Sequence, residues 1–313
     1  MLVVSRERQS FHDDCFTNFH SYVRAGDCLV LNNTRVFPAR LRGRRNTESG
    51  AVIEVFLLRA RDAGESVWDV LVKPSKRLRA GDRLIFNESF RADVLSRGDF
   101  GEHVVRFLAE EPIRDLLERL GETPLPPYIR RPPVPGDRER YQTVFAKKEG
   151  SIAAPTAGLH FTQETIEQCR GAGATIAYVT LHVGLGTFAP LREADLAQIR
   201  LHEEYFEISE ENARILKQAQ RLLCVGTTSV RTIETALLRG GLRGMSGETN
   251  LFIYPGFRFR GTGALLTNFH LPQSSLLMLV CAFAGTELTL AAYRQAVTER
   301  YRFFSYGDCM LIV

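Results

Sequence analysis

GSIAAPTAGLHFT (residues 150–162) and TIAYVTLHVGLGTFAP (residues 175–190) are two segments rich in small residues that enclose one predicted helix and strand. The helix is predicted over Thr162 to Arg170, because a threonine can cap its start and glycines follow its end. Ala174 to Leu181 is apolar and β-branched, which is typical of a buried strand. A helix followed by a buried strand indicates an α/β fold.

Each of the two segments holds a histidine next to a glycine-containing loop. His160 lies just before the predicted helix, and His182 lies at the end of the predicted strand. Ligands of open α/β sheets bind beside strand ends, and loops of small residues let backbone N–H groups approach a ligand. Tight turns alone would also explain such loops, but two of them around one unit favour a binding site.

Helices and strands continue to alternate after Pro190, which predicts an α/β domain with a mostly parallel sheet. Ser209 is the expected cap of one of these helices. The predicted strands are 202–208, 222–225, 250–254, 263–266 and 309–313, and the predicted helices are 193–199, 209–220, 226–238, 274–284 and 287–301.

The segment from Ala51 to Leu108 has a different pattern, because it consists of short strands separated by turns. Gly81-Asp82 is one of the turn signals. Such a series predicts a small barrel or sandwich. We therefore expect an inserted β-domain at 51–108 and an α/β domain formed by 1–50 and 109–313.

The composition predicts a cytoplasmic protein. Apolar residues make up 44% of the chain and charged residues 24%, as in globular proteins. The longest apolar run, Leu276 to Ala284, is shorter than the ~20 residues that cross a bilayer, and no signal peptide follows Met1. The six cysteines include no C-x-x-C pair, so no metal site is indicated. We expect a monomer without a membrane partner.

The net charge of +4 is compatible with a nucleic-acid partner, although a biased genome composition explains it equally well. Arg40, Arg42 and Arg44 alternate, so on a strand they would share one face. That face is either solvated or in contact with phosphates. Residues 124–135 contain six prolines and predict an extended linker, which could also clamp RNA.

Gly226, Thr227, Thr228 and Ser229 stand between a predicted strand and a predicted helix, with Arg231 close behind. Free N–H groups at a helix start, together with hydroxyls and an arginine, predict an anion site, although every helix start needs a cap. The segment is not a P-loop, because the Gly-Lys-Ser/Thr ending is missing.

Three further loops carry polar or aromatic groups. Gly184-Leu185-Gly186 lacks the third glycine of a dinucleotide fingerprint. Asn268 and His270 occupy a strand-to-helix loop. Tyr301 to Asp308 crowds four aromatic residues next to an acid, which indicates either core packing or a surface on which a base stacks.

Successive segments of the chain resemble the signatures of the S-adenosylmethionine:tRNA ribosyltransferase-isomerase family of queuosine biosynthesis. The resemblance spans Leu2 to Val313 and implies a three-layer α/β sandwich that carries a small β-barrel. The matching segments, in the family's order, are NNTRVFPARL, PLPPYI, YQTVFA, GSIAAPTAGLHFT, TLHVGLGTF, VGTTSVRTIE, TNFHLPQSSLLMLV and YRFFSYGD.

The resemblance implies that the ribosyl part of S-adenosylmethionine is transferred to a 7-aminomethyl-7-deazaguanine in the tRNA anticodon and rearranged, while adenine and methionine leave. S-adenosylmethionine would be the co-substrate, and no metal is required. A sulfonium acidifies the neighbouring carbon, so the reaction needs a base, and departure of adenine is helped by an acid. The expected candidates are His182 as base, with His160, His270 and Asp308.

The implied substrates also have expected binding residues. The methionine carboxylate would lie on Gly226, Thr227, Thr228 and Ser229 with Arg231. The tRNA would be contacted by Arg40, Arg42 and Phe303, through charge and stacking.

This chain departs from the family pattern at its start and at Gln273, where a basic residue is common. The family usually has an N-terminal segment before the strand at Leu2 to Val4, so either a late start codon or a loss is expected. An inactive tRNA-binding relative is therefore the alternative function. A methyltransferase is disfavoured, because no glycine-rich loop follows the first strand.

Overall fold

The computed structural model describes residues 1–47, 50–76, 78–98, 101–126, 128–129, 131–184, 199 and 201–313. These residues form two compact units. The first comprises Met1–Arg35, Gln142–Lys148 and Ala154–Val313, and the second comprises Val36–Tyr141 and Glu149–Ala153.

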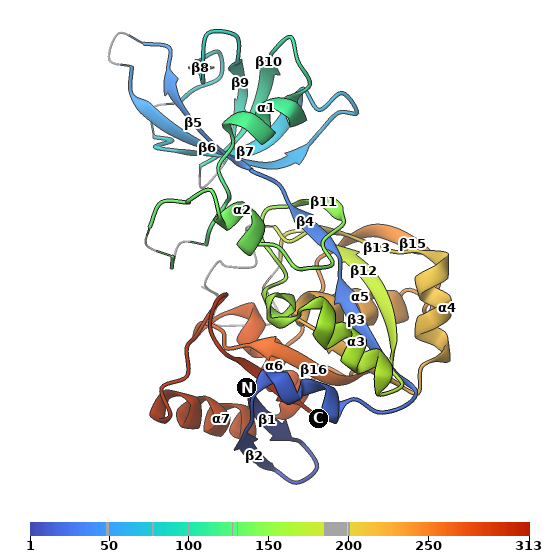
Figure 1. Cartoon of the computed structure of the whole chain (residues 1–313). Coiled ribbons are helices and arrows are strands. Elements are labelled where there is room, and N and C mark those ends of the chain that lie inside the picture. The colour runs from blue at the N-terminus through green and yellow to red at the C-terminus, as the bar shows by residue number, and fades with distance from the viewer. Residues whose placement is uncertain are drawn as a thin grey trace. The chain divides into compact units, whose positions relative to one another are not determined.

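In the described residues of the first unit, one mixed sheet has nine strands (Figure 1). In spatial order the strands are β15 (Met245–Thr249), β13 (Glu204–Ile208), β12 (Thr175–Leu181), β3 (Asp27–Asn32), β14 (Arg221–Val225), β16 (Thr262–Asn268), β17 (Cys309–Ile312), β1 (Leu2–Ser5) and β2 (Ser10–Asp13).

The four central strands β12, β3, β14 and β16 run parallel, as the alternation of helices and strands predicts. The strands next to them run antiparallel to the central group, β13 to β12 and β17 to β16, so the sheet is mixed and not mostly parallel. β17 reverses because the chain re-enters the sheet at the edge where β16 ends, so that Asn268 pairs with Cys309.

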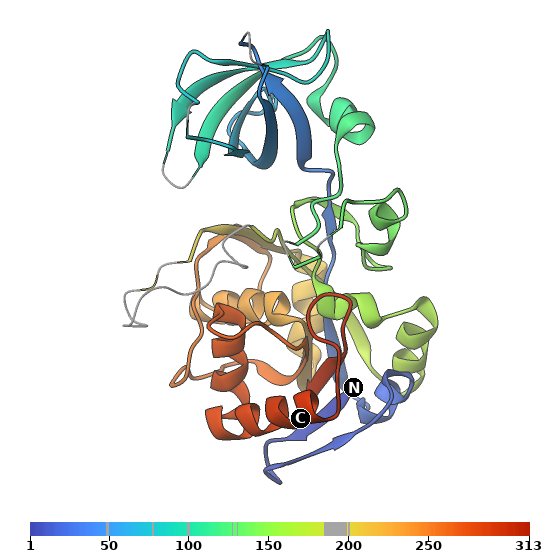
Figure 2. The ribbon, with the colours of Figure 1, turned by 90° about the vertical axis from the view of Figure 1, so that its left-hand side faces the viewer.

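Helices cover both faces of this sheet, which makes three layers (Figure 2). In that view η1 and α3 lie on one side of the sheet and the orange-to-red helices lie on the other. The helices of this unit are η1 (Phe16–Tyr22), η2 (Thr156–His160), α3 (Gln163–Gly171), α4 (Glu210–Gln218), α5 (Thr227–Leu238), α6 (Ser275–Ala284) and α7 (Thr286–Thr298).

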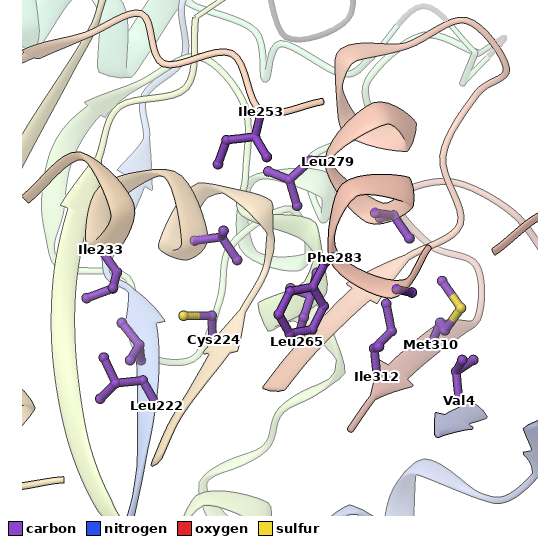
Figure 3. Packing of buried hydrophobic residues seen from close by; sticks show 14 of the residues in the cluster. Val4, Leu222, Cys224, Ile233, Ile253, Leu265, Leu279, Phe283, Met310 and Ile312 are labelled. Atoms are coloured by element: carbon purple, nitrogen blue, oxygen red, sulfur yellow. The ribbon is translucent and has the colours of Figure 1, made fainter. Parts of the chain in front are cut away.

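Alternating side chains of the central strands pack into two hydrophobic cores, one on each face of the sheet. On β3, Cys28 and Val30 pack with α4 to α7, whereas Leu29 and Leu31 pack with η1, η2 and α3. Figure 3 shows part of the first cluster, in which Ile233 of α5 and Phe283 of α6 pack on the sheet. This period of two buries both faces and places the loops at the strand ends.

Two predicted helix caps are confirmed. The side chains of Thr162 and Ser209 accept hydrogen bonds from the backbone N–H groups of Thr165 and Asn212. The strand expected at 250–254 is instead β15, five residues earlier, where mostly polar residues form the sheet edge. Most of the helix expected at 193–199 lies outside the described residues.

No single helix in the described ranges is long and apolar enough to cross a membrane. The pair α6 and α7 passes that test by length and composition together, but the two are bent by 115° at Gly285. Both helices contribute to the core of the sheet.

In the described part of the second unit, six strands form a closed barrel in the order β10-β7-β6-β5-β8-β9 (Figure 1). They are β5 (Arg40–Arg45), β6 (Val52–Ala60), β7 (Val67–Lys73), β8 (Arg83–Ile85), β9 (Arg91–Arg97) and β10 (Glu102–Leu108). Between the two units the chain passes through β4 (Thr34–Val36) and β11 (Lys148–Ser151), which pair with each other.

The barrel unit is wider than the 51–108 domain expected from the pattern. β5 closes the barrel between β6 and β8, so its residues belong to this unit. Helices α1 (Ile113–Leu120) and α2 (Asp137–Arg140) also belong to it.

The proline-rich segment at 124–135 is not a free linker, because described residues near both of its ends make contacts within the barrel unit. Leu125 is buried, and its carbonyl accepts a hydrogen bond from Arg40. Arg131 makes a bidentate ion pair with the buried Asp137. Local composition predicts an extended chain, but the backbone N–H of Asp137 donates to the Val134 carbonyl in a turn, and the contacts of Leu125 and Arg131 anchor the segment.

Candidate active site at the carboxyl edge of the sheet

The carboxyl ends of the four parallel strands meet at one edge of the first unit. β3 ends at Asn32, β12 at Leu181, β14 at Val225 and β16 at Asn268. The antiparallel strands β13 and β17 begin at the same edge. The predicted motif loops are therefore gathered here, where α/β sheets bind ligands.

His182 is held on two sides directly after β12. Its Nδ1 lies 2.7 Å from the Oγ1 of Thr34, and its backbone N–H donates to the carbonyl of Tyr205. Its ring is stacked on the ring of Tyr205, with the two centroids 5.4 Å apart. Contacts to two different neighbouring segments fix the orientation of this imidazole.

Asn32 and Asn33 stabilise the ends of β3 and β12, next to His182. Asn32 accepts hydrogen bonds from the backbone N–H groups of Thr34 and Leu181, and it donates to the Leu181 carbonyl. Thr180 donates to the Oδ1 of Asn33. These side-chain amides extend the ladder between β3 and β12 past its last backbone pair. Asn32, Asn33 and Thr34 are consecutive polar residues in the sequence, but only the fold connects them to His182.

His160 lies beside the end of β16. Asn268 Nδ2 lies 3.3 Å from His160 Nε2 and also donates to the Phe304 carbonyl. Because this amide nitrogen is a donor, Nε2 is the acceptor and neutral His160 carries its proton on Nδ1. Burial lowers the pKa of His160 to about 4, although the negative charge of Asp308 opposes this shift.

His270 is enclosed by two neighbours. Its Nε2 lies 2.7 Å from Thr267 Oγ1, and its backbone N–H donates to the hydroxyl of Tyr293. Burial lowers the pKa of His270 to about 4. At neutral pH both His160 and His270 are therefore uncharged.

The three histidines share the carboxyl edge, but their described contacts do not join them. His160 and His270 flank the end of β16, whereas His182 follows β12, with β3 and β14 between. Three strand spacings correspond to roughly 14 Å. One substrate molecule of extended shape can touch both groups of side chains.

Asp308 directly precedes β17 at the same edge. It accepts hydrogen bonds from the backbone N–H and the guanidinium of Arg302. Burial raises the pKa of Asp308, but these hydrogen bonds outweigh it and the pKa is lowered. The carboxylate is therefore ionised at neutral pH.

The start of α5 has the predicted glycine and hydroxyl groups. Gly226 has a φ of +87°, and within the described residues no side chain caps the helix. The buried hydroxyl of Thr228 has no hydrogen-bond partner among those residues, while the hydroxyl of Ser229 donates to the Val225 carbonyl. Thr227 is also buried. The helix thus presents N–H groups and the hydroxyl of Thr228.

Arg231 lies one turn further along α5, and its main partner is a residue that sequence reasoning missed. Its Nη1 pairs with Glu204, its Nε donates to the Leu251 carbonyl, and both charged side chains are about 5% exposed. Glu204 also accepts from the backbone N–H of Gly184 at 2.7 Å. The only feature of the sequence that could have pointed to Glu204 was its position as an acid near the start of a predicted strand. Leu185 and Gly186, which follow Gly184, lie outside the described residues.

The expected tRNA contacts lie in different settings. Arg40 and Arg42 lie on β5 of the barrel unit, where Arg42 pairs with Glu122 at 2.8 Å and is more than half exposed. Arg40 is more buried and donates to Leu125. Phe303 packs against Phe269 and is part of the core periphery of the first unit, which reduces the ring face left for stacking.

In the part of the chain that the structure describes, no group of three or more His, Cys, Asp or Glu side chains is arranged to hold a metal ion. The described cysteines are all reduced, and Cys15 is the exposed one among them.

The chain is similar to known proteins over its whole length. A family model described as "Queuosine biosynthesis protein" matches residues 1–312. An S-adenosylmethionine:tRNA ribosyltransferase-isomerase from Solibacter usitatus is 54% identical, over 100% of this chain and 92% of that protein. A protein of the same name from Caldanaerobacter subterraneus is 45% identical over the same shares.

A solved structure agrees with these matches. The crystal structure of an S-adenosylmethionine tRNA ribosyltransferase from Thermotoga maritima is 36% identical, with a TM-score of 0.54, and the alignment covers 100% of this chain and 91% of that one. The fold, the motif loops at the carboxyl edge and these similarities agree, and the chain belongs to the queuosine biosynthesis protein family.

Proposed function

We propose that this chain transfers the ribosyl moiety of S-adenosylmethionine to the 7-aminomethyl-7-deazaguanine of tRNA and isomerises it, giving epoxyqueuosine-tRNA and releasing adenine and methionine. The observation that supports this activity is the 54% identity, over the full chain, to a protein named for it. The alternative, an inactive tRNA-binding relative, is not favoured, because the candidate catalytic groups are all present at one edge of the sheet.

The methionine carboxylate of the co-substrate is proposed to bind at the start of α5. The first-turn N–H groups of Thr227, Thr228 and Ser229 carry the positive end of the helix dipole, which attracts an anion, and Gly226 lets the ligand approach although its own N–H donates to the Leu266 carbonyl. The buried Thr228 hydroxyl supports this assignment, because a buried donor without a protein partner is costly unless a ligand accepts from it. Arg231 is proposed to add its positive charge to this site, since Nη1 pairs with Glu204 while the buried Nη2 has no partner among the described residues.

His182 is the proposed base that takes the proton beside sulfur. A general base must be largely unprotonated and still basic near the working pH. His160 and His270, with pKa values of about 4, are weak bases and cannot supply a proton at neutral pH. They are proposed to orient the adenine through hydrogen bonds, and the ionised Asp308 is proposed to stabilise positive charge nearby.

The tRNA is proposed to meet the exposed guanidinium of Arg42 on the barrel unit, with Arg40 behind it and Phe303 contributing a ring edge. The guanidinium group of arginine can form two parallel hydrogen bonds to a phosphate, and the unpaired bases of an anticodon loop can stack on aromatic rings. A tRNA substrate places the proposed reaction in the cytoplasm. We propose that the chain acts as a monomer and without a metal.

The test is incubation of the chain with S-adenosylmethionine and tRNA that carries the 7-aminomethyl-7-deazaguanine precursor, followed by nucleoside mass spectrometry and adenine quantification. Formation of epoxyqueuosine with one adenine per modified nucleoside is expected. Binding of tRNA without adenine release would instead establish the inactive relative.

A further inference from the structure

Two residues after His182, a backbone N–H group donates to a side-chain carboxylate. In a regular β-sheet the acceptor at that position would be a backbone carbonyl of the neighbouring strand. β12 and β13 pair antiparallel up to Leu181 and Phe206, and the backbone N–H of His182 still donates to the Tyr205 carbonyl. The next N–H on that side of the strand belongs to Gly184, and it donates to the carboxylate of Glu204. The chain therefore leaves the sheet at a position that Glu204 determines.

Arg231 neutralises the carboxylate of Glu204. Its second oxygen pairs with Arg231 Nη1, and the two side chains are 4% and 6% exposed. A buried carboxylate without a cation would cost several kcal/mol, so each partner requires the other. Arg231 is in turn fixed by the Leu251 carbonyl. The pair thus connects α5, the start of β13 and the segment after β12.

We infer that Glu204 is a positioning residue that, together with Arg231, sets where His182 stands for proton removal. The inference rests on the proposed function and adds a residue to it that contacts neither co-substrate nor tRNA. A displacement of a catalytic group by about 1 Å can reduce turnover roughly 100-fold. Loss of the Gly184 acceptor should therefore reduce turnover while binding of S-adenosylmethionine at the start of α5 persists.

Two double variants separate positioning from stability. Glu204→Gln with Arg231→Met keeps an acceptor oxygen for Gly184, whereas Glu204→Leu with Arg231→Met removes it. Both lack the buried charges, and replacement of such a pair by neutral groups is tolerated better than removal of one partner. Glu207→Gln is the matched control. Glu207 lies on β13, as Glu204 does, and its half-buried carboxylate pairs with Lys148.

The expected result is a kcat for the Leu/Met variant about 10- to 100-fold below that of the Gln/Met variant, at similar KM for S-adenosylmethionine and similar Tm. Hydrogen exchange of the Gly184 amide should be faster in the Leu/Met variant alone, and Glu207→Gln should behave as the unchanged chain. Equal kcat and equal exchange in the two double variants would overturn the inference, and so would a loss of kcat that only follows Tm. Absence of adenine release by the unchanged chain would instead contradict the proposed function.

Discussion

Thr34 and His182 are 148 positions apart in the chain, yet the hydroxyl of the first lies 2.7 Å from Nδ1 of the second. Thr34 Oγ1 also lies 3.5 Å from the Lys148 carbonyl, to which it can donate. A hydroxyl that donates there accepts from Nδ1–H of the imidazole. This arrangement favours the tautomer whose Nε2 carries a lone pair, which a base requires.

Thr34→Val should reduce turnover because it removes this hydroxyl while keeping the volume of the side chain. We expect kcat to fall about tenfold or more, since the lost hydrogen bond corresponds to about 1–2 kcal/mol, with little change in KM for S-adenosylmethionine. Steady-state adenine release measures this. Thr235→Val, which removes another buried hydroxyl paired with Thr249, is the control. An unchanged kcat for Thr34→Val would remove His182 as base in this tautomer.

Thr228→Val should weaken binding of S-adenosylmethionine without destabilising the fold. The hydroxyl has no partner among the described residues, so its removal breaks no protein hydrogen bond, but a carboxylate at the start of α5 would lose a donor. Calorimetry should show a Kd raised about tenfold, and the Tm should stay the same or rise. Thr232→Val, one turn later with its hydroxyl on the Thr228 carbonyl, is the control. Equal affinities for both variants would move the carboxylate elsewhere.

Stability should fall as the pH is lowered from about 6.5 to about 4, and His160 and His270 should contribute to the fall. Burial lowers the pKa of each in the folded state to about 4, so the unfolded chain takes up these protons first. The neutral forms of both histidines favour folding above the unfolded pKa, and each shift to about 4 removes on the order of 3 kcal/mol of stability by pH 4.

His270→Gln should flatten this pH profile in urea titrations, because a neutral side chain replaces the titrating ring. His12→Gln, at an exposed position on β2, is the control and should keep the slope of the unchanged chain. A slope that is identical in all three proteins would show that His270 is not the buried neutral group described above.

Arg42→Ala should weaken tRNA binding while leaving the affinity for S-adenosylmethionine unchanged. A phosphate contact contributes to affinity through released counterions, so the salt dependence of binding should decrease by about one ion. Filter binding at several salt concentrations measures this. Arg83→Ala is matched, because Arg83 is also an exposed arginine of the barrel with an acidic partner, Asp93. If the two variants lose affinity equally, the effect is one of net charge and not of position.

The sequence correctly predicted helix caps and a buried strand, because these depend on residues close together in the chain. Thr162 and Ser209 cap their helices as expected, because a cap is decided within three residues. The apolar run before His182 forms the central strand β12, since both of its faces are buried. The resemblance to the family likewise predicted the three-layer fold and the barrel that the structure contains.

The sequence did not predict the start of the barrel or the partner of Arg231, because both depend on residues far apart in the chain. The barrel begins at β5 because closure requires a strand between β6 and β8, which the pattern at Ala51 does not reveal. The sequence did not indicate that Arg231, expected at an anion site, also pairs through Nη1 with Glu204, 27 residues away. The sign of a charge is visible in a sequence, whereas its partner is decided by which surfaces become buried together.

The sequence alone thus determined which residue types stand at strand ends and helix starts: His160 and His182 beside glycine-containing loops, His270 in a strand-to-helix loop, and the hydroxyl series that opens α5. The tertiary structure alone decided that these loops share one edge, that burial makes two of the histidines neutral, and that Thr34 contacts the third while Glu204 binds the backbone two residues after it. Capping and periodicity arise from neighbours within a few residues, whereas pKa and orientation arise from burial and from partners that only the packed sheet brings together.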